Sequence, residues 1–142
     1  MKSFFFILGK YCIYKKGHHC PKGLKKGFVF WNDDDYSLYN GDKHGGELPE
    51  FYLYNERYTE IHFCCRTDGE KNTPILLPIE FPFFLLAYES AKCQMVKWAL
   101  VSLEWIYFAT SNFNNDDQRD GAYPYDARKK HPTIYYCYYH SK

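Results

Sequence analysis

The sequence predicts an all-β domain, a pseudo-twofold β-sandwich or barrel built from two duplicated units and stapled by disulfides. The first observation is a repeated spacing: Cys20 and Cys64 lie 44 positions apart, and so do Cys93 and Cys137. The second is that each pair ends within a short aromatic run. The third is composition, because 15 Tyr and 12 Phe bring the aromatic content to 21%, and both residue types favour the half-buried surface of strands.

The repeat also predicts the domain organisation. A chain of 142 residues has the length of one ordinary domain. We expect one domain over residues 1–142 with repeat units at about 9–72 and 73–142. Neither unit has enough strands to bury both faces of a sheet alone, so the two units are expected to share a core.

The first unit is predicted to hold three strands. Residues 4–8 and 11–14 are expected to form one edge strand, broken at Gly9. Residues 27–31 form the next, and residues 58–66 form a third in which apolar and polar positions alternate. A polar segment at 32–46, rich in turn-forming residues, separates the last two strands.

The second unit is predicted to repeat this order. Strands are expected at 75–77, 83–88, 95–100, 103–108 and 133–140, and only residues 91–101 also fit a helical turn. A second polar loop covers 112–121. Aligned by hand, residues 28–31 lie over 105–108 and residues 46–49 lie over 121–124.

Six cysteines are typical of a three-disulfide, extracellular domain. A zinc site would favour Cys-x-x-Cys or clustered Cys and His, and neither pattern is present. Cys64 and Cys65 are adjacent in a predicted strand, so their side chains point to opposite faces and need different partners. The repeated spacing therefore predicts the bridges Cys20–Cys64 and Cys93–Cys137, which leaves Cys12–Cys65 as the third.

Charge and hydropathy exclude some functions. With 18 basic and 17 acidic residues, the chain lacks the basic excess of a nucleic-acid-binding domain; the lysines at 15–26 form a local basic patch or a solvated face. The apolar run at 4–8 is shorter than the core of a secretion signal, so we expect a strand there. The longest apolar stretch, 74–88, contains three prolines and Glu80, which predicts no transmembrane segment.

An ordered set of short motifs covers nearly the whole chain. They are GKYCI at 9–13, CPKGL at 20–24, GFVFWND at 27–33, GELP at 46–49, FCCRTDG at 63–69, TPILLP at 73–78, FFLL at 83–86, CQMV at 93–96, EWIYF at 104–108, YPY at 123–125 and YYCYY at 135–139. In this order the motifs resemble the C-terminal domain of apextrin, the ApeC domain.

The resemblance implies a secreted animal domain associated with innate immunity and development. Family members are described as recognising peptidoglycan and its muramyl peptides, while others accompany membrane-attack modules or occur in extracellular coats, and no catalytic chemistry is attached to the domain. This chain departs from the family at Phe108-Ala109-Thr110, where Trp-Asp and further acids are typical, and at Cys12, where a small residue is common. We therefore expect the first unit to carry any ligand site.

The two polar loops are the expected binding site, because loops on a rigid scaffold often carry function. Aromatic faces and Asp side chains suit sugar rings and hydroxyls, although Trp31 could instead pack in the core. The second loop carries Asn112, Asn114, Asn115, Asp116, Asp117 and Asp120, flanked by Tyr123 and Tyr125. The predicted ligand-binding residues are Trp31, Asp33, Asp34, Asp35, Tyr36, Tyr39, Asp42 and His44.

Calcium is a possible ligand of the same loop. Asp33, Asp35 and Asp42 are the candidate ligands, since calcium takes carboxylate oxygens. Their order does not match an EF-hand, and a solvated acidic loop is the alternative. No other cofactor is expected.

These patterns favour a non-catalytic, secreted module that binds bacterial cell-wall polysaccharide or glycopeptide. No Ser or Cys nucleophile motif has an adjacent base, and Glu80, Glu89 and Glu104 each lie apart from other carboxylates in the sequence. A pair of loop carboxylates of the kind that glycosidases use is the one catalytic alternative left. The alternative is a structural, self-assembling protein of an extracellular coat or matrix, in which residues 1–8 add a strand to a neighbouring sheet.

Overall fold

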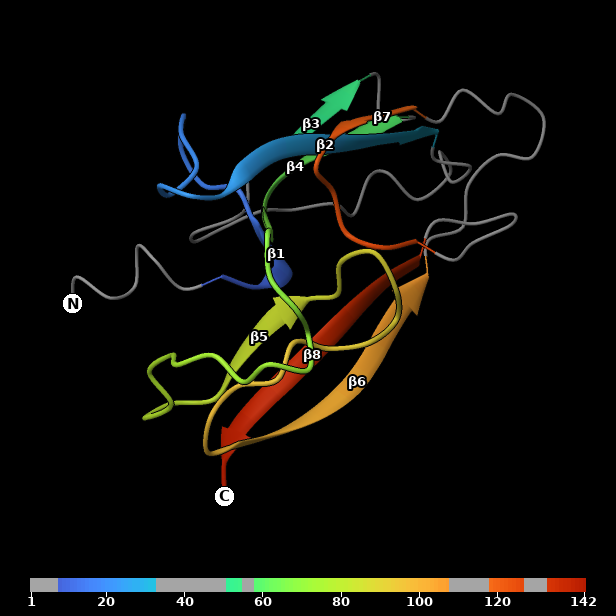
Figure 1. Ribbon diagram of the computed structural model, residues 1–142. Helices are drawn as coiled ribbons and strands as arrows, with labels where there is room; N and C mark the ends of the chain where they lie inside the picture. The colour runs from blue at the N-terminus through green and yellow to red at the C-terminus, as the bar shows by residue number, and fades with distance from the viewer. Residues whose placement is uncertain (1–7, 33–50, 55–57, 108–117, 127–132) are drawn as a thin grey trace.

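The computed structural model describes residues 8–32, 51–54, 58–107, 118–126 and 133–142. This part of the chain forms eight strands and no helix, which confirms the all-β prediction (Figure 1). The strands are β1 (Lys10–Tyr14), β2 (Lys25–Asn32), β3 (Phe51–Tyr54), β4 (Tyr58–Thr67), β5 (Phe83–Leu86), β6 (Ala99–Tyr107), β7 (Gln118–Gly121) and β8 (Thr133–Ser141).

The strands belong to one sheet in the order β6-β8-β5-β1-β4-β2-β7, and β3 pairs with β4. All of these pairings are antiparallel. Between the two end strands, β6 and β7, no pairing is found among the described strands. The described strands therefore form a single curled sheet, and neither the two packed sheets of a sandwich nor the closed sheet of a barrel is found among them.

Strand β1 does not lie at the edge that the sequence predicts. It pairs with β4 on one side and β5 on the other. The reason is that both of its faces are apolar: Cys12 and Tyr14 pack into one core cluster, and Tyr11 and Ile13 pack against a second. Of the apolar run at 4–8, only Leu8 is among the described residues, and it lies outside any strand.

The two halves of the sheet share their strand order and part of their register. The order β1-β4-β2 in one half corresponds to β5-β8-β6 in the other. Lys26 pairs with Cys64, and Leu103 pairs with Cys137, as the hand alignment of the repeats expects. Strands β3 and β7 break the correspondence, because β3 pairs with β4 while β7 pairs with β2 and not β8. The duplication therefore stays a prediction.

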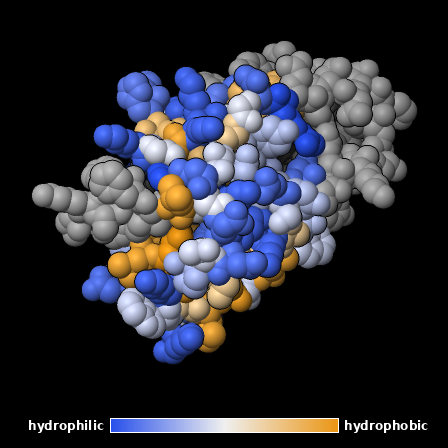
Figure 2. Space-filling model, viewed as in Figure 1, coloured by the Kyte–Doolittle hydropathy of each residue, from blue (hydrophilic) through white to orange (hydrophobic). Residues whose placement is uncertain are grey.

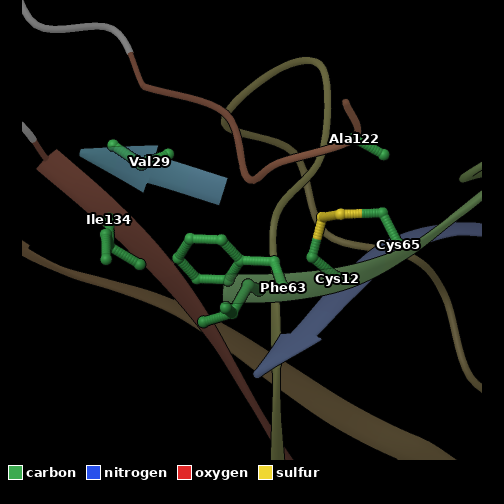
Figure 3. Close-up of a cluster of buried hydrophobic side chains, with 7 residues drawn as sticks. Cys12, Val29, Phe63, Cys65, Ala122 and Ile134 are labelled. Atoms are coloured by element: carbon green, nitrogen blue, oxygen red, sulfur yellow. A yellow bond between two sulfur atoms is a disulfide. The ribbon is translucent and has the colours of Figure 1, made fainter. Parts of the chain in front are cut away.

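The first core cluster explains why the sheet curls. Val29 of β2 and Ile134 of β8 belong to the same cluster (Figure 3), although β5, β1 and β4 lie between these strands in the sheet order. Phe63 and the Cys12–Cys65 bridge fill the space between them. Burying these side chains together brings β2 and β8, the strands next to the two end strands, toward each other.

The second core cluster lies on the other face of β5 and β8. The connection before β5 and the connection after it meet at an isolated bridge between Ile75 and Val96, and both residues pack with Cys137 and Tyr139. The predicted strands at 75–77 and 95–100 are wrong: this region is irregular, and β6 begins only at Ala99. Residues 91–101, which also fit a helical turn in the sequence, form no helix.

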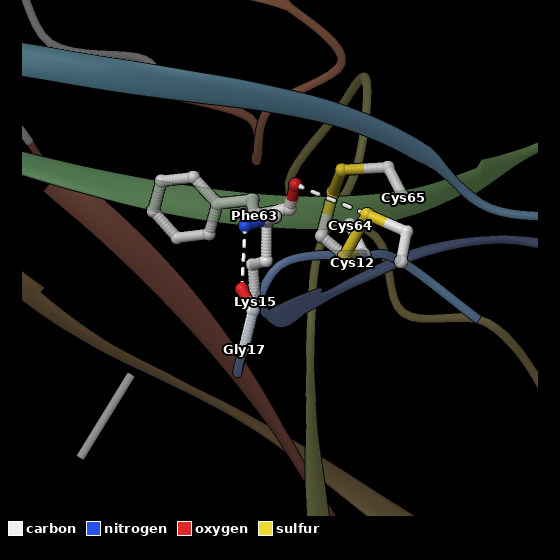
Figure 4. The surroundings of a disulfide bond; sticks show 7 residues. Cys12, Lys15, Gly17, Phe63, Cys64 and Cys65 are labelled. Atoms are coloured by element: carbon white, nitrogen blue, oxygen red, sulfur yellow. Dashed lines mark hydrogen bonds between the residues drawn. A yellow bond between two sulfur atoms is a disulfide. The ribbon is translucent and has the colours of Figure 1, made fainter. Parts of the chain in front are cut away.

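The three predicted disulfides are confirmed: Cys12–Cys65, Cys20–Cys64 and Cys93–Cys137. Cys12 and Cys65 lie directly opposite each other in the β1–β4 pair, with 4.0 Å between their Cα atoms. The adjacent Cys64 takes the other face and bonds Cys20 near the turn after β1 (Figure 4). The same turn is held by Lys15, whose Nζ donates a 2.6 Å hydrogen bond to the carbonyl of Gly17.

Candidate functional site

Most of the predicted ligand residues lie outside the described part of the chain. Trp31 lies in β2 opposite Thr59, and its side chain is not among those that the structure describes. Asp120 of the second loop lies in β7, exposed and opposite Phe28. The predicted residues outside the described ranges are Asp33, Asp34, Asp35, Tyr36, Tyr39, Asp42, His44, Asn112, Asn114, Asn115, Asp116 and Asp117.

Tyr123 and Tyr125, which flank the second polar loop, line a pocket of about 310 Å³. The segment that carries them leaves β7 and is tied to the sheet by two backbone hydrogen bonds. Ala122 N donates to the carbonyl of Lys26 at 3.2 Å, and Tyr125 N donates to the carbonyl of Ala87 at 2.8 Å. The pocket therefore lies where β7, β2 and the end of β5 meet.

Two glycines allow β7 to approach β2 this closely. Gly121 has φ of +70°, and a Cβ on it would lie 2.4 Å from the carbonyl oxygen of Lys26. A Cβ on Gly27 would lie 2.1 Å from the carbonyl oxygen of Ala122. Such distances exclude any side chain at either position, so both glycines are needed for the backbone that forms one wall of the pocket.

The charged centre of the pocket is the pair of Arg119 and Asp126. An Nη of Arg119 lies 2.9 Å from Oδ2 of Asp126, whose other oxygen accepts a 3.1 Å hydrogen bond from Thr133 N. The Asp126 side chain is 8% exposed, so it is a buried anchor for a guanidinium that is 28% exposed. The guanidinium carbon also lies 5.8 Å from the centroid of the Tyr123 ring, within cation–π range.

A second ion pair borders the pocket. Glu89, at φ of +73°, accepts a 2.8 Å hydrogen bond from Nζ of Lys10. This hydrogen bond lowers the pKa of Glu89 and raises the pKa of Lys10. Glu89 is thus paired with Lys10 at the rim of the pocket.

This arrangement can bind a ligand that combines a sugar ring with a carboxylate. Tyr88, Tyr123 and Tyr125 offer aromatic faces and hydroxyls, which suit the apolar and polar surfaces of a sugar. One donor of Arg119 is used by Asp126, and its other N–H groups have no partner among the described residues. A guanidinium with spare donors is a specific receptor for a carboxylate.

A second hollow, of about 540 Å³, is mainly apolar. Phe84, Trp105 and Ile106 are among its lining residues, together with Tyr14 and Tyr136, whose hydroxyl oxygens lie 2.5 Å apart. Burial raises the pKa of Tyr14 well above its ordinary value. The two tyrosine hydroxyls satisfy each other, and Glu104 is the one charged residue of the lining. Apart from Glu104, the hollow therefore suits an apolar occupant.

No cluster of His, Cys, Asp and Glu able to hold a metal ion is found within the described residues. The calcium candidates Asp33, Asp35 and Asp42 fall outside those residues, so calcium binding stays a prediction. The part of the chain that the structure describes also contains no long apolar helix of the kind that crosses a bilayer.

The fold and its bridges define a small, disulfide-stapled all-β domain, and three disulfides fit an extracellular domain. The model of one family, the C-terminal domain of apextrin (ApeC), matches residues 1–139. The chain belongs to this family, as the ordered motifs predict. ApeC is not a known catalytic family. No curated protein and no solved structure matched the chain.

Three residues of this pocket, Arg119, Asp126 and Tyr88, were not predicted as site residues from the sequence. Arg119 and Asp126 are seven positions apart, and the second oxygen of Asp126 is held by Thr133 N of β8, so their pairing depends on how β7 and β8 are placed. The only available signal was a lone arginine within an acidic loop, followed by the predicted aromatic pair at 123 and 125.

Proposed function

We propose that this chain is a non-catalytic, secreted recognition module that binds bacterial cell-wall glycopeptide. The observation that carries the proposal is the placement of Arg119 between buried Asp126 and the Tyr123 ring, in a pocket lined by further tyrosines. Muramyl peptides combine sugar rings with carboxylates, the two groups that this pocket suits. Membership of the apextrin family supports the same ligand class.

The first polar loop remains part of this proposal. It carries Asp35, Tyr36 and Tyr39, which we propose as additional ligand contacts on sequence grounds. The pocket and the loop consist of different residues, so variants in each can show which of the two binds the ligand.

Retention on insoluble peptidoglycan tests the proposal. We expect the wild type to sediment with the polymer and Tyr123→Ala to lose about tenfold in affinity, since one aromatic contact is worth about 1–1.5 kcal/mol. Arg119→Lys keeps the positive charge beside Asp126 but removes the planar guanidinium that can bind a carboxylate through two N–H groups. This variant should therefore also weaken retention. Phe81→Ala is the matched control, because Phe81 is 78% exposed and lies outside the pocket.

Three outcomes decide between the assignments. Weaker retention of both pocket variants, with Phe81→Ala unchanged, supports the pocket. Unchanged pocket variants, combined with loss of retention by the triple variant Asp35→Asn, Tyr36→Ala and Tyr39→Ala, contradict the pocket and favour the first loop. No retention of the wild type contradicts the function itself.

A further inference from the structure

Strand β6 ends the sheet and presents apolar side chains on both of its faces. Its only strand partner in the described part of the chain is β8, and β6 forms the outermost ribbon of its half (Figure 1). Figure 2 shows hydrophobic residues gathered in the half that holds β5, β6 and β8. The exposed fractions are 48% for Leu100, 40% for Val101, 43% for Leu103, 59% for Trp105 and 50% for Ile106.

A long, apolar edge strand is a template for pairing with another chain. We propose that β6 pairs with β6 of a second copy, antiparallel about a twofold axis at Leu103. In this register Leu103 lies opposite itself, and Val101 lies opposite Trp105 of the second copy. Both are apolar pairs on the same face, and an aromatic residue opposite a β-branched one is a favourable cross-strand pair.

The charge on the strand fits the same register. Glu104 is the one charged residue of β6 (Ala99–Tyr107), and about Leu103 it lies opposite Ser102 of the second copy, a hydrogen-bonding residue. An axis at Glu104 would instead place two carboxylates directly opposite each other, which is unfavourable. The strand is therefore complementary to itself about Leu103.

The apolar hollow provides an independent reason for choosing a second copy as the occupant. Ile106 lines this hollow, and in the proposed register it lies opposite Leu100 of the second copy. Leu100 and Ile106 are on the same face of β6 and about half exposed. The twofold axis thus brings an exposed leucine of each copy to the apolar hollow of the other.

The available surface is large enough for a specific dimer. Aromatic side chains present about 150–250 Å² and aliphatic ones less, so exposed fractions of 40–59% for five side chains, four of them aliphatic, give roughly 400 Å² of apolar surface per copy. Standard protein interfaces bury about 800 Å² per partner, polar atoms included. The strand backbone and the polar side chains of β6 would supply the remainder.

Sedimentation velocity tests the proposal and its register. The wild type should associate with rising concentration, and its mass should level off at twice the chain mass of 17.0 kDa, because a twofold contact closes on itself. Leu103→Lys and Leu103→Glu should each be monomeric, since each places like charges opposite each other. An equimolar mixture of the two should associate again, because position 103 faces itself.

Leu8→Lys is the matched control: Leu8 is 54% exposed and precedes β1, which β8 and β5 separate from β6 in the sheet, so it should leave association unchanged. Circular dichroism and intact mass establish that each variant keeps its fold and bridges. A wild type that stays monomeric to about 100 μM, above the micromolar range of ordinary interfaces, overturns the proposal. So does a mixture of the two charge variants that fails to associate, or a mass that grows beyond two copies.

Discussion

The hydroxyl of Tyr139 donates a 2.6 Å hydrogen bond to the backbone carbonyl of Gln94, and both residues are buried. The Gln94 side chain then holds two further segments: Nε2 donates to the carbonyl of Thr73 at 2.9 Å, and Oε1 accepts from Lys10 N at 2.8 Å. These contacts join irregular segments on both sides of β5 to strands β1 and β8. They satisfy backbone groups that have no ladder partner there.

Removing the Tyr139 hydroxyl should destabilise the fold. Tyr139→Phe leaves the buried carbonyl of Gln94 without this donor, which should cost about 1–2 kcal/mol of unfolding free energy. Urea denaturation followed by circular dichroism measures the change. Tyr138→Phe, at a half-buried neighbouring position, is the control and should have little effect. Equal stability of the two variants would contradict the role of the Tyr139 hydroxyl.

Lys71 should make stability depend on pH. Its side chain is buried, and Nζ donates to Oγ of Ser90 at 2.9 Å. Burial, offset by Glu89 and reinforced by Lys10 and Lys92, lowers the pKa of Lys71 to about 8. The unfolded chain therefore binds more protons between pH 8 and pH 10.5, so this group penalises folding most below pH 8 and less as the pH rises.

Lys71→Met isolates this effect. In the wild type, the free-energy cost of burying the charged Lys71 amine decreases as the pH rises from 7 to 9.5. The stability advantage of the variant over the wild type should therefore fall by about 2 kcal/mol over this range. Denaturation at the two pH values measures the difference. Exposed Lys92→Met has no burial penalty to relieve and should show no such change. A pH-independent difference for Lys71→Met would show that the buried amine does not lose its proton there.

Each disulfide should contribute strongly to stability. Replacing both cysteines of Cys20–Cys64 or Cys93–Cys137 with alanine opens a loop of 44 residues, which should cost about 3–4 kcal/mol in the chain-entropy model. Thermal unfolding of the two paired variants measures this. Intact mass after alkylation without reductant should show no modified cysteine, and any alkylated thiol would contradict the three-bridge structure.

Gly121 should tolerate alanine less well than Gly17 does. Both have positive φ, but a Cβ on Gly17 meets nothing within 4 Å, whereas one on Gly121 meets Lys26. Gly17→Ala should cost only backbone strain, about 1–2 kcal/mol. Gly121→Ala adds a clash, and should cost at least about 2 kcal/mol more, as well as weakening ligand binding at the pocket. Equal costs would contradict the close approach of β7 to β2.

The parts of the fold that were predictable are those with a strong local pattern. Strands β2, β4 and β8 alternate or carry aromatic runs. The equal cysteine spacing indicated two of the bridges and left Cys12–Cys65 as the third. Strand β7 was missed because Gln118–Gly121 is entirely polar or glycine; its pairing depends on space left by Gly27, far away in the sequence. The segments at 75–77 and 95–100 were predicted as strands because they are rich in apolar residues. Residues 75–77 and 95–98 instead fold as irregular backbone around Gln94, and of these only Ile75 and Val96 are buried.

The candidate site was likewise predictable only where a local sequence pattern indicates it. Tyr123 and Tyr125 were predictable as aromatic residues beside a polar loop. The pairing of Arg119 with Asp126 was not, because neither residue belongs to a motif and the contact requires the tertiary arrangement of β7 and β8.

Chemical-shift mapping with muramyl dipeptide tests the central claim most directly. Amide resonances of ¹⁵N-labelled protein would be followed during titration with the soluble ligand, with Tyr123→Ala as the comparison. Perturbations that saturate and cluster at residues 88–89 and 119–126, and that are lost in Tyr123→Ala, are the predicted result. Perturbations confined to other parts of the sheet, or none at saturating ligand, would contradict recognition of cell-wall glycopeptide at this pocket.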